Sequence, residues 1–287
     1  MNSSAYISII RPVNCIVAGI AGVLAYFIVT GSIQWIVLMI WCMVFLITAA
    51  GNVINDYYDA AIDAINRPDR PIPSGAISQP MALRYAIFLF LLGNLIGVIS
   101  LAYGMILPLI IALWNSILLW WYAKHLKTTP GFGNAVVAYL SASIFLFGAA
   151  FTVPHMLVHT LTYALPIAGA TFGVMFAREI IKDAEDVVGD RDANAKTLPI
   201  LYGIPRSILI SSCCGICGII FSLSLFFCWG FFYLVGIIVV DLIILFGIVA
   251  VFPCTTPECV KQRNGSRYLK CGMFCSLVVF FFSAAFL

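Results

Sequence analysis

The stretch 34-QWIVLMIWCMVFLITAAGNVI-54 runs directly into 55-NDYYDAAID-63. The first part is a continuous apolar segment of about the length, roughly 20 residues, that crosses the hydrocarbon core of a bilayer as a helix. The second part places polar side chains four residues apart, at Asn55, Asp59 and Asp63, so they share one face if the helix continues. The stretch therefore predicts a membrane-spanning helix that carries a carboxylate cluster beyond its apolar part.

The composition of the whole chain also indicates a membrane protein. Of its 287 residues, 63% are apolar and only 9% are charged, and the mean hydropathy is +1.07. A soluble domain carries about 25% charged residues. In lipid every backbone N–H and C=O must be bonded internally, which leaves helices or a closed barrel. Because the apolar segments are long and do not alternate with polar residues, we expect an all-α, polytopic membrane protein.

Nine apolar segments are long enough to cross a bilayer as helices. Their expected bounds are 13–32, 34–54, 82–102, 105–123, 134–152, 157–177, 207–227, 231–252 and 269–287. The first segment lacks a small-residue cleavage site and leads directly into the second, which disfavours a signal peptide. We therefore expect one transmembrane domain over residues 1–287, with membrane lipid around it and no nucleic-acid partner.

Basic residues mark one face of the expected bundle. All 15 Lys and Arg residues fall on the side of the N-terminus, and the opposite connections, around 30–34, 102–105, 152–157 and 228–231, carry none. The positive-inside rule then places the N-terminus and these loops in the cytoplasm of a multi-pass protein of the cell membrane. All but one of the 12 acidic residues follow the same face, although orientation does not require it.

The exception is Asp241, which lies inside the eighth apolar segment. An acid within a membrane-spanning segment is a functional candidate by default. A hydrogen bond within the bundle would also account for it, and we favour that interpretation.

The ten cysteines show no metal-ligand pattern. Several lie inside apolar segments, where thiols behave as small apolar groups. Cys254 and Cys259 flank a polar loop and could pair, but thiols on a cytosolic face are kept reduced. We therefore expect free thiols.

A second acidic cluster follows the sixth apolar segment and reads 178-REIIKDAEDVVGD-190. Asp186 and Asp190 are again four residues apart, and Asp183 lies on the adjoining turn. Like charges at this spacing destabilise a bare helix by about 0.3 kcal/mol per pair. Because the chain repeats the pattern on one face of the membrane, we expect a cation to offset the repulsion.

The donor atoms of both clusters indicate which cation this is. All are hard oxygens, which favour Mg²⁺ over zinc or copper. Mg²⁺ takes one or two carboxylates and completes its coordination with water and substrate phosphate oxygens. The stiff, proline-rich loop 67-RPDRPIPSG-75 follows the first cluster. The basic residues that suit a diphosphate are Arg67, Arg70, Lys124, Lys127, Arg178 and Lys182, and we count Lys182 among the catalytic candidates.

An apolar bundle with such a rim suits a lipid that carries a diphosphate head, and prenyl diphosphates have that form. Mg²⁺ and cationic side chains stabilise the charge on the leaving diphosphate, so the allylic C–O bond can ionise without a covalent enzyme intermediate. A nearby acceptor then captures the carbocation while the bundle excludes water. No nucleophile–histidine pair is required, and His125, His155 and His159 supply none.

The motifs N-D-x-x-D-x-x-x-D with R-P-x-P-S-G, and K-D-x-x-D-x-x-G-D with T-L-P, resemble those of the UbiA superfamily of intramembrane prenyltransferases. The resemblance implies nine transmembrane helices around a central cavity capped by cytosolic loop helices. It also implies a prenyl diphosphate donor and two Mg²⁺ ions. Carried over by position, the ligands of one ion would be Asn55, Asp59 and Asp63, and those of the other Asp186 and Asp190. We count Asp183, on the adjoining turn, as a further metal candidate.

The family also uses a Tyr–Lys element for the diphosphate, near the end of the fourth helix. In this sequence the matching stretch is 120-WWYAKHLK-127. Tyr122 would pair with either Lys124 or Lys127, and both registers stay open.

Within the superfamily, the opening 10-IRPVN-14, the second motif with K-T-L-P-I and the compact length look most like the archaeal branch that forms the second ether bond of archaeal membrane lipids. That resemblance implies transfer of a geranylgeranyl group from geranylgeranyl diphosphate to a lipid phosphate acceptor, geranylgeranylglyceryl phosphate.

Two other functions stay open. The acceptor could be an aromatic quinone precursor or a chlorin, or the chain could be a cation-coupled transporter that uses the acids as a pathway. Transport sites tend to lie near the bilayer midplane, whereas these carboxylates are expected at the rim, which favours the enzyme. The sequence does not predict the donor chain length or the oligomeric state.

Overall fold

The computed structural model describes residues 3–153, 155–192 and 195–286, and no β-strand occurs in these ranges. The all-α class expected from the sequence is therefore confirmed. Leu287, the last residue of the ninth expected segment, lies outside the described residues, as do Met1 and Asn2.

Nine helices of the described part are long and apolar enough to cross a membrane, and each matches one expected segment. They are α2 (Pro12–Thr30), α3 (Ile36–Asn66), α4 (Gln79–Ile99), α5 (Leu107–Lys124), α6 (Phe132–Ala150), α7 (Leu157–Glu185), α10 (Ile204–Ser224), α11 (Phe226–Val251) and α13 (Gly265–Phe286). The shorter elements are α1 (Ser3–Ile9), η1 (Ser100–Tyr103), η2 (Leu126–Thr128), α8 (Val187–Asp192), α9 (Leu198–Tyr202) and α12 (Pro257–Arg263). The chain is a multi-pass membrane protein.

These helices form two compact units. Unit 1 holds Met1–His125 and Phe147–Leu157, and unit 2 holds Leu126–Leu146 and Val158–Leu287. Each acidic cluster lies within one unit, the first in unit 1 and the second in unit 2. A single domain over the whole chain, the central cavity with its cap and the side of the membrane that each loop faces stay predictions.

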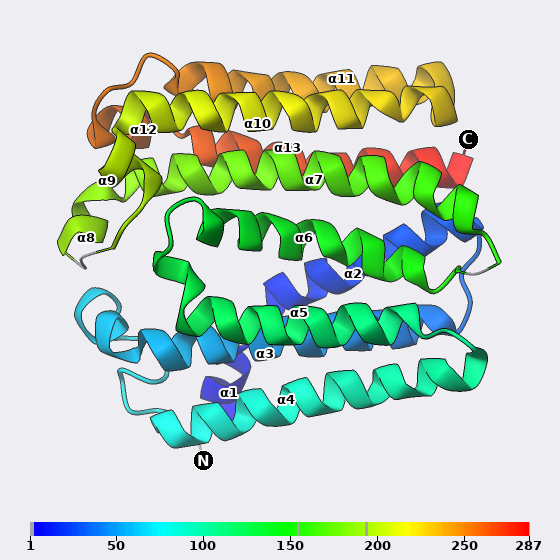
Figure 1. Ribbon diagram of the computed structural model, residues 1–287, viewed down its shortest axis with the longest axis horizontal. Coiled ribbons are helices and arrows are strands. Elements are labelled where there is room, and N and C mark those ends of the chain that lie inside the picture. The colour runs from blue at the N-terminus through cyan, green and yellow to red at the C-terminus, as the bar shows by residue number, and fades with distance from the viewer. Residues whose placement is uncertain (1–2, 154, 193–194, 287) are drawn as a thin grey trace. The chain divides into compact units, whose positions relative to one another are not determined.

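In unit 1, α3 packs against α2, α4 and α5 (Figure 1). No proline interrupts α3, so the helix runs past the expected end of the apolar segment at residue 54 and continues to Asn66. It ends there because Pro68 follows, and a residue before proline is disfavoured in the helical conformation. The backbone N–H of Arg67 closes the last turn on the carbonyl of Asp63 at 2.8 Å. The first acidic cluster is thus helical, as its spacing predicts.

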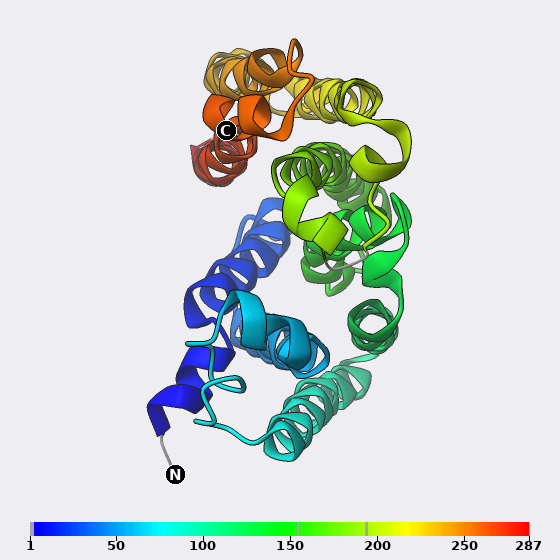
Figure 2. The same cartoon turned by 90° about the vertical axis from the view of Figure 1, so that its left-hand side faces the viewer.

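In unit 2, α11 lies beside α13 and also packs against α10 (Figure 2). Helices α7 and α10 approach closely at Gly173 and Gly218, where a Cβ on Gly173 would lie 2.6 Å from the carbonyl oxygen of Cys214. Small residues of this kind let the backbones of membrane helices come into contact. This packing holds α7 in place, and the second acidic cluster lies at its C-terminal end.

Helical hydrogen bonding continues from α7 into α8 across Asp186, although the regular helix ends at Glu185. The backbone N–H of Asp186 donates to Lys182 O at 3.0 Å, and that of Asp190 donates to Asp186 O at 3.0 Å. The four-residue spacing of Asp186 and Asp190 therefore keeps them one helical turn apart.

Asp241 is buried on α11 and accepts two contacts from the hydroxyl of Ser222 on α10, at 2.8 and 3.0 Å. Tyr233 donates its hydroxyl to the backbone carbonyl of Ser222 at 2.7 Å. The acid is thus bonded within unit 2, and the structural interpretation of Asp241 is confirmed.

The expectation of free thiols is wrong for one pair, because a disulfide joins Cys254 to Cys259. The turn between α11 and α12 brings their Cα atoms to 5.5 Å, within the range that a disulfide spans. Thr256 shapes this turn, since its hydroxyl caps α12 by accepting from the backbone N–H of Cys259 at 3.3 Å. Sequence separation alone did not show this turn.

Candidate active site

Three carboxylates are buried on the last turns of α3. Asp56, Asp59 and Asp63 expose 4%, 8% and 6% of their surface. A buried charge without a partner costs several kcal/mol, in the range of about 3–5 kcal/mol when one member of a pair is removed. These acids therefore require cationic or hydrogen-bonding partners close by.

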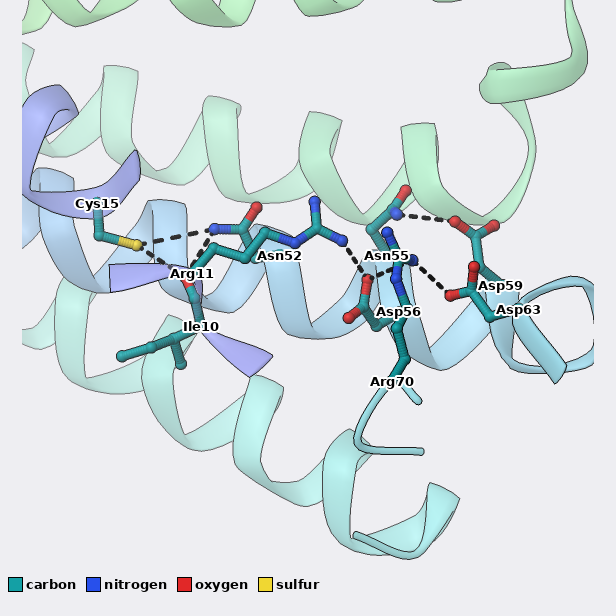
Figure 3. A network of polar contacts seen from close by, with 9 residues as sticks. All are labelled: Ile10, Arg11, Cys15, Asn52, Asn55, Asp56, Asp59, Asp63 and Arg70. Atoms are coloured by element: carbon teal, nitrogen blue, oxygen red, sulfur yellow. Dashed lines mark hydrogen bonds and ion pairs between the residues drawn. The ribbon is translucent and has the colours of Figure 1, made fainter. Parts of the chain in front are cut away.

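Two arginines from distant segments supply part of that compensation (Figure 3). Arg11 Nη2 lies 2.5 Å from Asp56 Oδ1. Arg70 Nη1 lies 2.5 Å from Asp63 Oδ2 and 3.3 Å from Asp56 Oδ1. Asp56 thus accepts from both guanidinium groups, and the segment before α2, the end of α3 and the proline-rich loop meet at one carboxylate.

The backbone before α2 fixes where Arg11 lies. Arg11 has φ 53° and ψ 67°, a left-handed conformation that separates α1 from α2, and Pro12 begins α2. Asn52 on α3 donates to the carbonyl of Ile10 at 2.8 Å. This bond attaches the junction to the helix that carries Asp56.

Asn55 and Asp59, two of the predicted metal ligands, are in direct contact. Asn55 Nδ2 donates to Asp59 Oδ2 at 2.8 Å (Figure 3). The pair is one helical turn apart, as the sequence predicts. The structure therefore brings Asn55, Asp59 and Asp63 onto the end of one helix, where their oxygen atoms are available as hard donors.

The other phosphate-binding candidates of unit 1 are Arg67, Tyr122 and Lys124. Arg67 is exposed and makes no ion pair among the described residues, in contrast to Arg70 three positions later. Tyr122 is half-buried and Lys124 exposed on the last turns of α5. The register of the Tyr–Lys element stays open.

The second cluster has different partners. Asp183 accepts from Asn134 Nδ2 of α6 at 2.7 Å. Asp186 is exposed and Asp190 half-buried. Burial raises the pKa of Asp190 above its usual value, and the neighbouring Asp186 raises it further, whereas Lys182 and Lys127 lower it. Lys127 and Lys182, both predicted to bind phosphate, thus lie near this acid.

The guanidinium of Arg178 pairs with the carboxylate of Glu179, and its role in binding phosphate stays a prediction. Glu179 was missed by the sequence reasoning, although a signal was present. Positions 179, 183, 186 and 190 are spaced by four, three and four residues, which places all four acids on one helical face. Arg11, Asp56 and Asn134 were also missed as site residues, and for Arg11 and Asn134 no local spacing connects them to their partners.

The residues present fit Mg²⁺ if water and phosphate oxygens complete the coordination of the ion. In the ranges that the structure describes, no three His, Cys, Asp or Glu side chains are grouped so that they could hold a metal by themselves. Mg²⁺ usually takes only one or two carboxylates and keeps water and phosphate oxygens as its other ligands. Asn55, Asp59 and Asp63 suit this ligand set, since all three side chains offer oxygen donors at the end of α3 and both carboxylates are buried.

The sequence of these elements matches a known family along most of its length. Residues 13–278 match the profile of the UbiA prenyltransferase family. The chain belongs to the UbiA prenyltransferase family. It is therefore a prenyltransferase, as the two Asp motifs predict.

Curated UbiA relatives match the chain from end to end. Digeranylgeranylglyceryl phosphate synthase of Methanospirillum hungatei JF-1 is 53% identical over 288 residues, which is 100% of both chains. The enzyme of the same name from Methanoregula boonei is 50% identical over 287 residues, again 100% of both. That of Methanoculleus marisnigri is 46% identical over 99% of each chain.

Solved UbiA structures share the fold. One, described as concerning digeranylgeranylglyceryl phosphate synthase in membranes, has a TM-score of 0.83 and 31% identity over 99% of both chains. A UbiA homolog from Archaeoglobus fulgidus bound to DMAPP and Mg²⁺ has a TM-score of 0.71 over 98% of this chain and 99% of its own. At 18% identity the second likeness shows the fold alone.

Proposed function

We propose that this UbiA enzyme transfers a geranylgeranyl group from geranylgeranyl diphosphate to geranylgeranylglyceryl phosphate, in a reaction that depends on Mg²⁺. The product would carry the second ether bond of an archaeal membrane lipid. The observation that carries the proposal is the full-length identity of 53% to a digeranylgeranylglyceryl phosphate synthase, in a chain that keeps both Asp motifs.

Mg²⁺ has its own support. The solved Archaeoglobus fulgidus homolog binds DMAPP with Mg²⁺, and another structure of that homolog binds GPP with Mg²⁺. The proposed ligands in this chain are Asn55, Asp59 and Asp63 for one ion and Asp186 and Asp190 for another, with Asp183 held beside the second set by Asn134. Bound Mg²⁺ would stabilise the negative charge that develops on the diphosphate as it leaves.

The side chains of the protein have three proposed tasks. The carboxylates position the ions, and burial on α3 keeps competing water away from Asp59 and Asp63. Lys127 and Lys182, near Asp190, attract the diphosphate by charge. Arg70 offers a planar fork of donors that matches phosphate oxygens.

The bond changes balance without a covalent enzyme intermediate. The allylic C–O bond breaks and its electron pair leaves with the diphosphate. The hydroxyl oxygen of the acceptor then forms a new C–O bond to the carbocation and loses its proton. The net products are an ether, diphosphate and a proton.

The test is prenyl transfer by the purified full chain with Mg²⁺ and geranylgeranyl diphosphate. Geranylgeranylglyceryl phosphate and 4-hydroxybenzoate are offered in parallel as acceptors, and EDTA serves as the control for metal. We expect product with the glyceryl phosphate alone and none with EDTA. Product with the aromatic acid alone would move the enzyme to a quinone branch and overturn the proposed acceptor.

A further inference from the structure

Arg70 makes contacts that a purely phosphate-binding arginine would not need. Its Nη1 atom lies 2.5 Å from Asp63 Oδ2 and 3.3 Å from Asp56 Oδ1 (Figure 3). Its side chain is only 19% exposed. One guanidinium nitrogen thus neutralises two acids that are two helical turns apart on α3.

Asp63 is also a proposed Mg²⁺ ligand, so one carboxylate has two candidate cations. A Mg²⁺ ion requires its ligand oxygens at about 2.0–2.1 Å. A guanidinium nitrogen in hydrogen-bond contact with the same oxygen would then lie within a few ångströms of a divalent charge. At that separation the repulsion between cations amounts to several kcal/mol even at an effective dielectric constant of about 20.

We propose that Arg70 is an exchangeable counter-cation of the metal site: Mg²⁺ displaces its guanidinium from Asp63, and the released guanidinium then binds the substrate diphosphate. This inference rests on the proposed function, because it requires a Mg²⁺–diphosphate substrate. It goes beyond that function by coupling metal loading to the position of a loop side chain.

Asp56 lowers the energetic cost of the exchange, because it has a second arginine partner. Arg11 is its closer partner, at 2.5 Å against 3.3 Å for Arg70. When Arg70 leaves, Asp56 keeps one guanidinium and is not left as an unpaired buried charge, which would be strongly unfavourable. Arg11 itself is fixed by the junction that Asn52 holds through Ile10. Arg11 is the permanent partner and Arg70 the mobile one.

The loop that carries Arg70 has structure independent of the ion pairs. Its turns are closed by backbone bonds from Ser74 N to Arg70 O at 2.9 Å and from Ile77 N to Pro71 O at 2.9 Å. Ile77 is 2% exposed and anchors the end of the loop. The guanidinium can therefore change partners by side-chain rotation without unfolding the loop, although the loop opens more often once its ion pairs to α3 are lost.

The first test is binding of Mn²⁺, as a paramagnetic substitute for Mg²⁺, measured by electron paramagnetic resonance on the full chain in detergent without substrate. Removing a competing cation should strengthen binding, so we expect Arg70→Gln to bind Mn²⁺ about fivefold more tightly than the wild type. Arg84→Gln is the matched control, because Arg84 is exposed on α4 and its loss changes the net charge equally. Equal or weaker binding by Arg70→Gln, or an equal gain in Arg84→Gln, would overturn the exchange.

A second variant and a second ligand separate exchange from simple charge removal. Arg70→Lys keeps the charge but cannot present two donors in a planar fork. We expect its Mn²⁺ affinity to lie between those of the wild type and Arg70→Gln. With Mg²⁺ present, both variants should bind inorganic pyrophosphate more weakly than the wild type, and undiminished pyrophosphate binding would contradict the second half of the proposal.

Hydrogen exchange of the segment 68–78 gives a readout that needs neither variant nor turnover. Mg²⁺ alone should increase amide exchange there, because the loop loses its ion pairs to α3. Mg²⁺ with pyrophosphate should decrease it again. If Mg²⁺ alone leaves the exchange unchanged, the coupling is wrong. None of these measurements uses a prenyl acceptor, so a wrong acceptor would leave their outcomes intact.

Discussion

The two acidic clusters share a four-residue spacing but differ in how their charge is compensated. In unit 1 the carboxylates are buried, and arginines from two distant segments contact Asp56 and Asp63. In unit 2, Asp183 accepts from an uncharged amide and Asp190 lies near two lysines. The same motif therefore specifies where oxygens are placed, and the surrounding fold decides what they cost in stability.

The difference has a consequence for substitutions of Asp by Asn, which remove charge but keep shape. In the first cluster such a change leaves arginines without a charged partner. In the second cluster it removes a partly buried negative charge. The same substitution should thus destabilise the first cluster more than the second, while loss of a proposed metal ligand lowers activity in either.

The largest expected effect is on activity. Asp59→Asn and Asp190→Asn should each lower kcat by about 100-fold or more, because each removes a proposed ligand of a charge-stabilising ion. The assay is prenyl transfer at saturating donor, with size-exclusion chromatography in detergent to verify folding. Asp69→Asn is the control, since Asp69 is exposed in the nearby loop and has no proposed role. Near wild-type turnover in either site variant would show that the clusters do not both bind metal.

Stability should separate the clusters next. Asp56→Asn leaves Arg11 and Arg70 with a weaker acceptor, and we expect a loss of about 2 kcal/mol, since Arg11 is 35% exposed and its share is reduced by solvent. Asp183→Asn should cost less than about 1 kcal/mol, because its amide oxygen can still accept from Asn134. Chemical denaturation in detergent measures both. Equal losses would mean that the arginine network adds nothing specific to unit 1.

The two asparagines that bond to acids provide a finer comparison. Asn134→Ala breaks a link between α6 and α7 and should lower the free energy of unfolding by about 1–2 kcal/mol. Asn55→Ala breaks a bond within α3, so its effect on stability should be smaller. Its effect should appear in Mn²⁺ affinity instead. A stability loss from Asn55→Ala as large as that from Asn134→Ala would argue against this division.

The smallest effect concerns Asp190, whose raised pKa makes its ionised form a cost to folding. The cost is absent below the ordinary Asp pKa, about 3.9, grows as the pH rises towards the higher folded-state value and is complete above that value. With EDTA present, Asp190→Asn should therefore raise Tm slightly at pH 7, by an amount equivalent to less than about 1 kcal/mol because the group is half-exposed. The gain should vanish near pH 3.5. A destabilised variant at pH 7 would contradict the sign.

Much of this could be predicted from local sequence. The nine apolar segments predict the nine long helices of the described residues. In lipid the backbone N–H and C=O groups of such a segment must bond to one another, which a helix achieves. The spacing of Asn55, Asp59 and Asp63 predicts their shared face because residues four apart lie about one turn apart on a helix. Both inferences depend only on the residues within one element.

What could not be predicted depends on long-range packing. Arg11 and Asp56 are 45 residues apart, and their contact requires the left-handed turn at Arg11. Asn134 and Asp183 are 49 residues apart and come from different helices. The Cys254–Cys259 disulfide is local but depends on the turn that Thr256 caps. Glu179 is the exception, because its four-residue spacing to Asp183 is visible in the sequence.

The length of α3 links the chemistry to the thickness of the bilayer. A helix of 31 residues is about 46 Å long, whereas the hydrocarbon core measures about 30 Å. Because one unbroken helix carries both the lipid-facing residues and the carboxylates, hydrophobic mismatch along its apolar part would shift Asp59 and Asp63 towards or away from the headgroups. In reconstituted vesicles, acyl-chain length would then tune turnover without any change to the protein. A prenyltransferase of this kind would in this way respond to the thickness of the membrane that surrounds it.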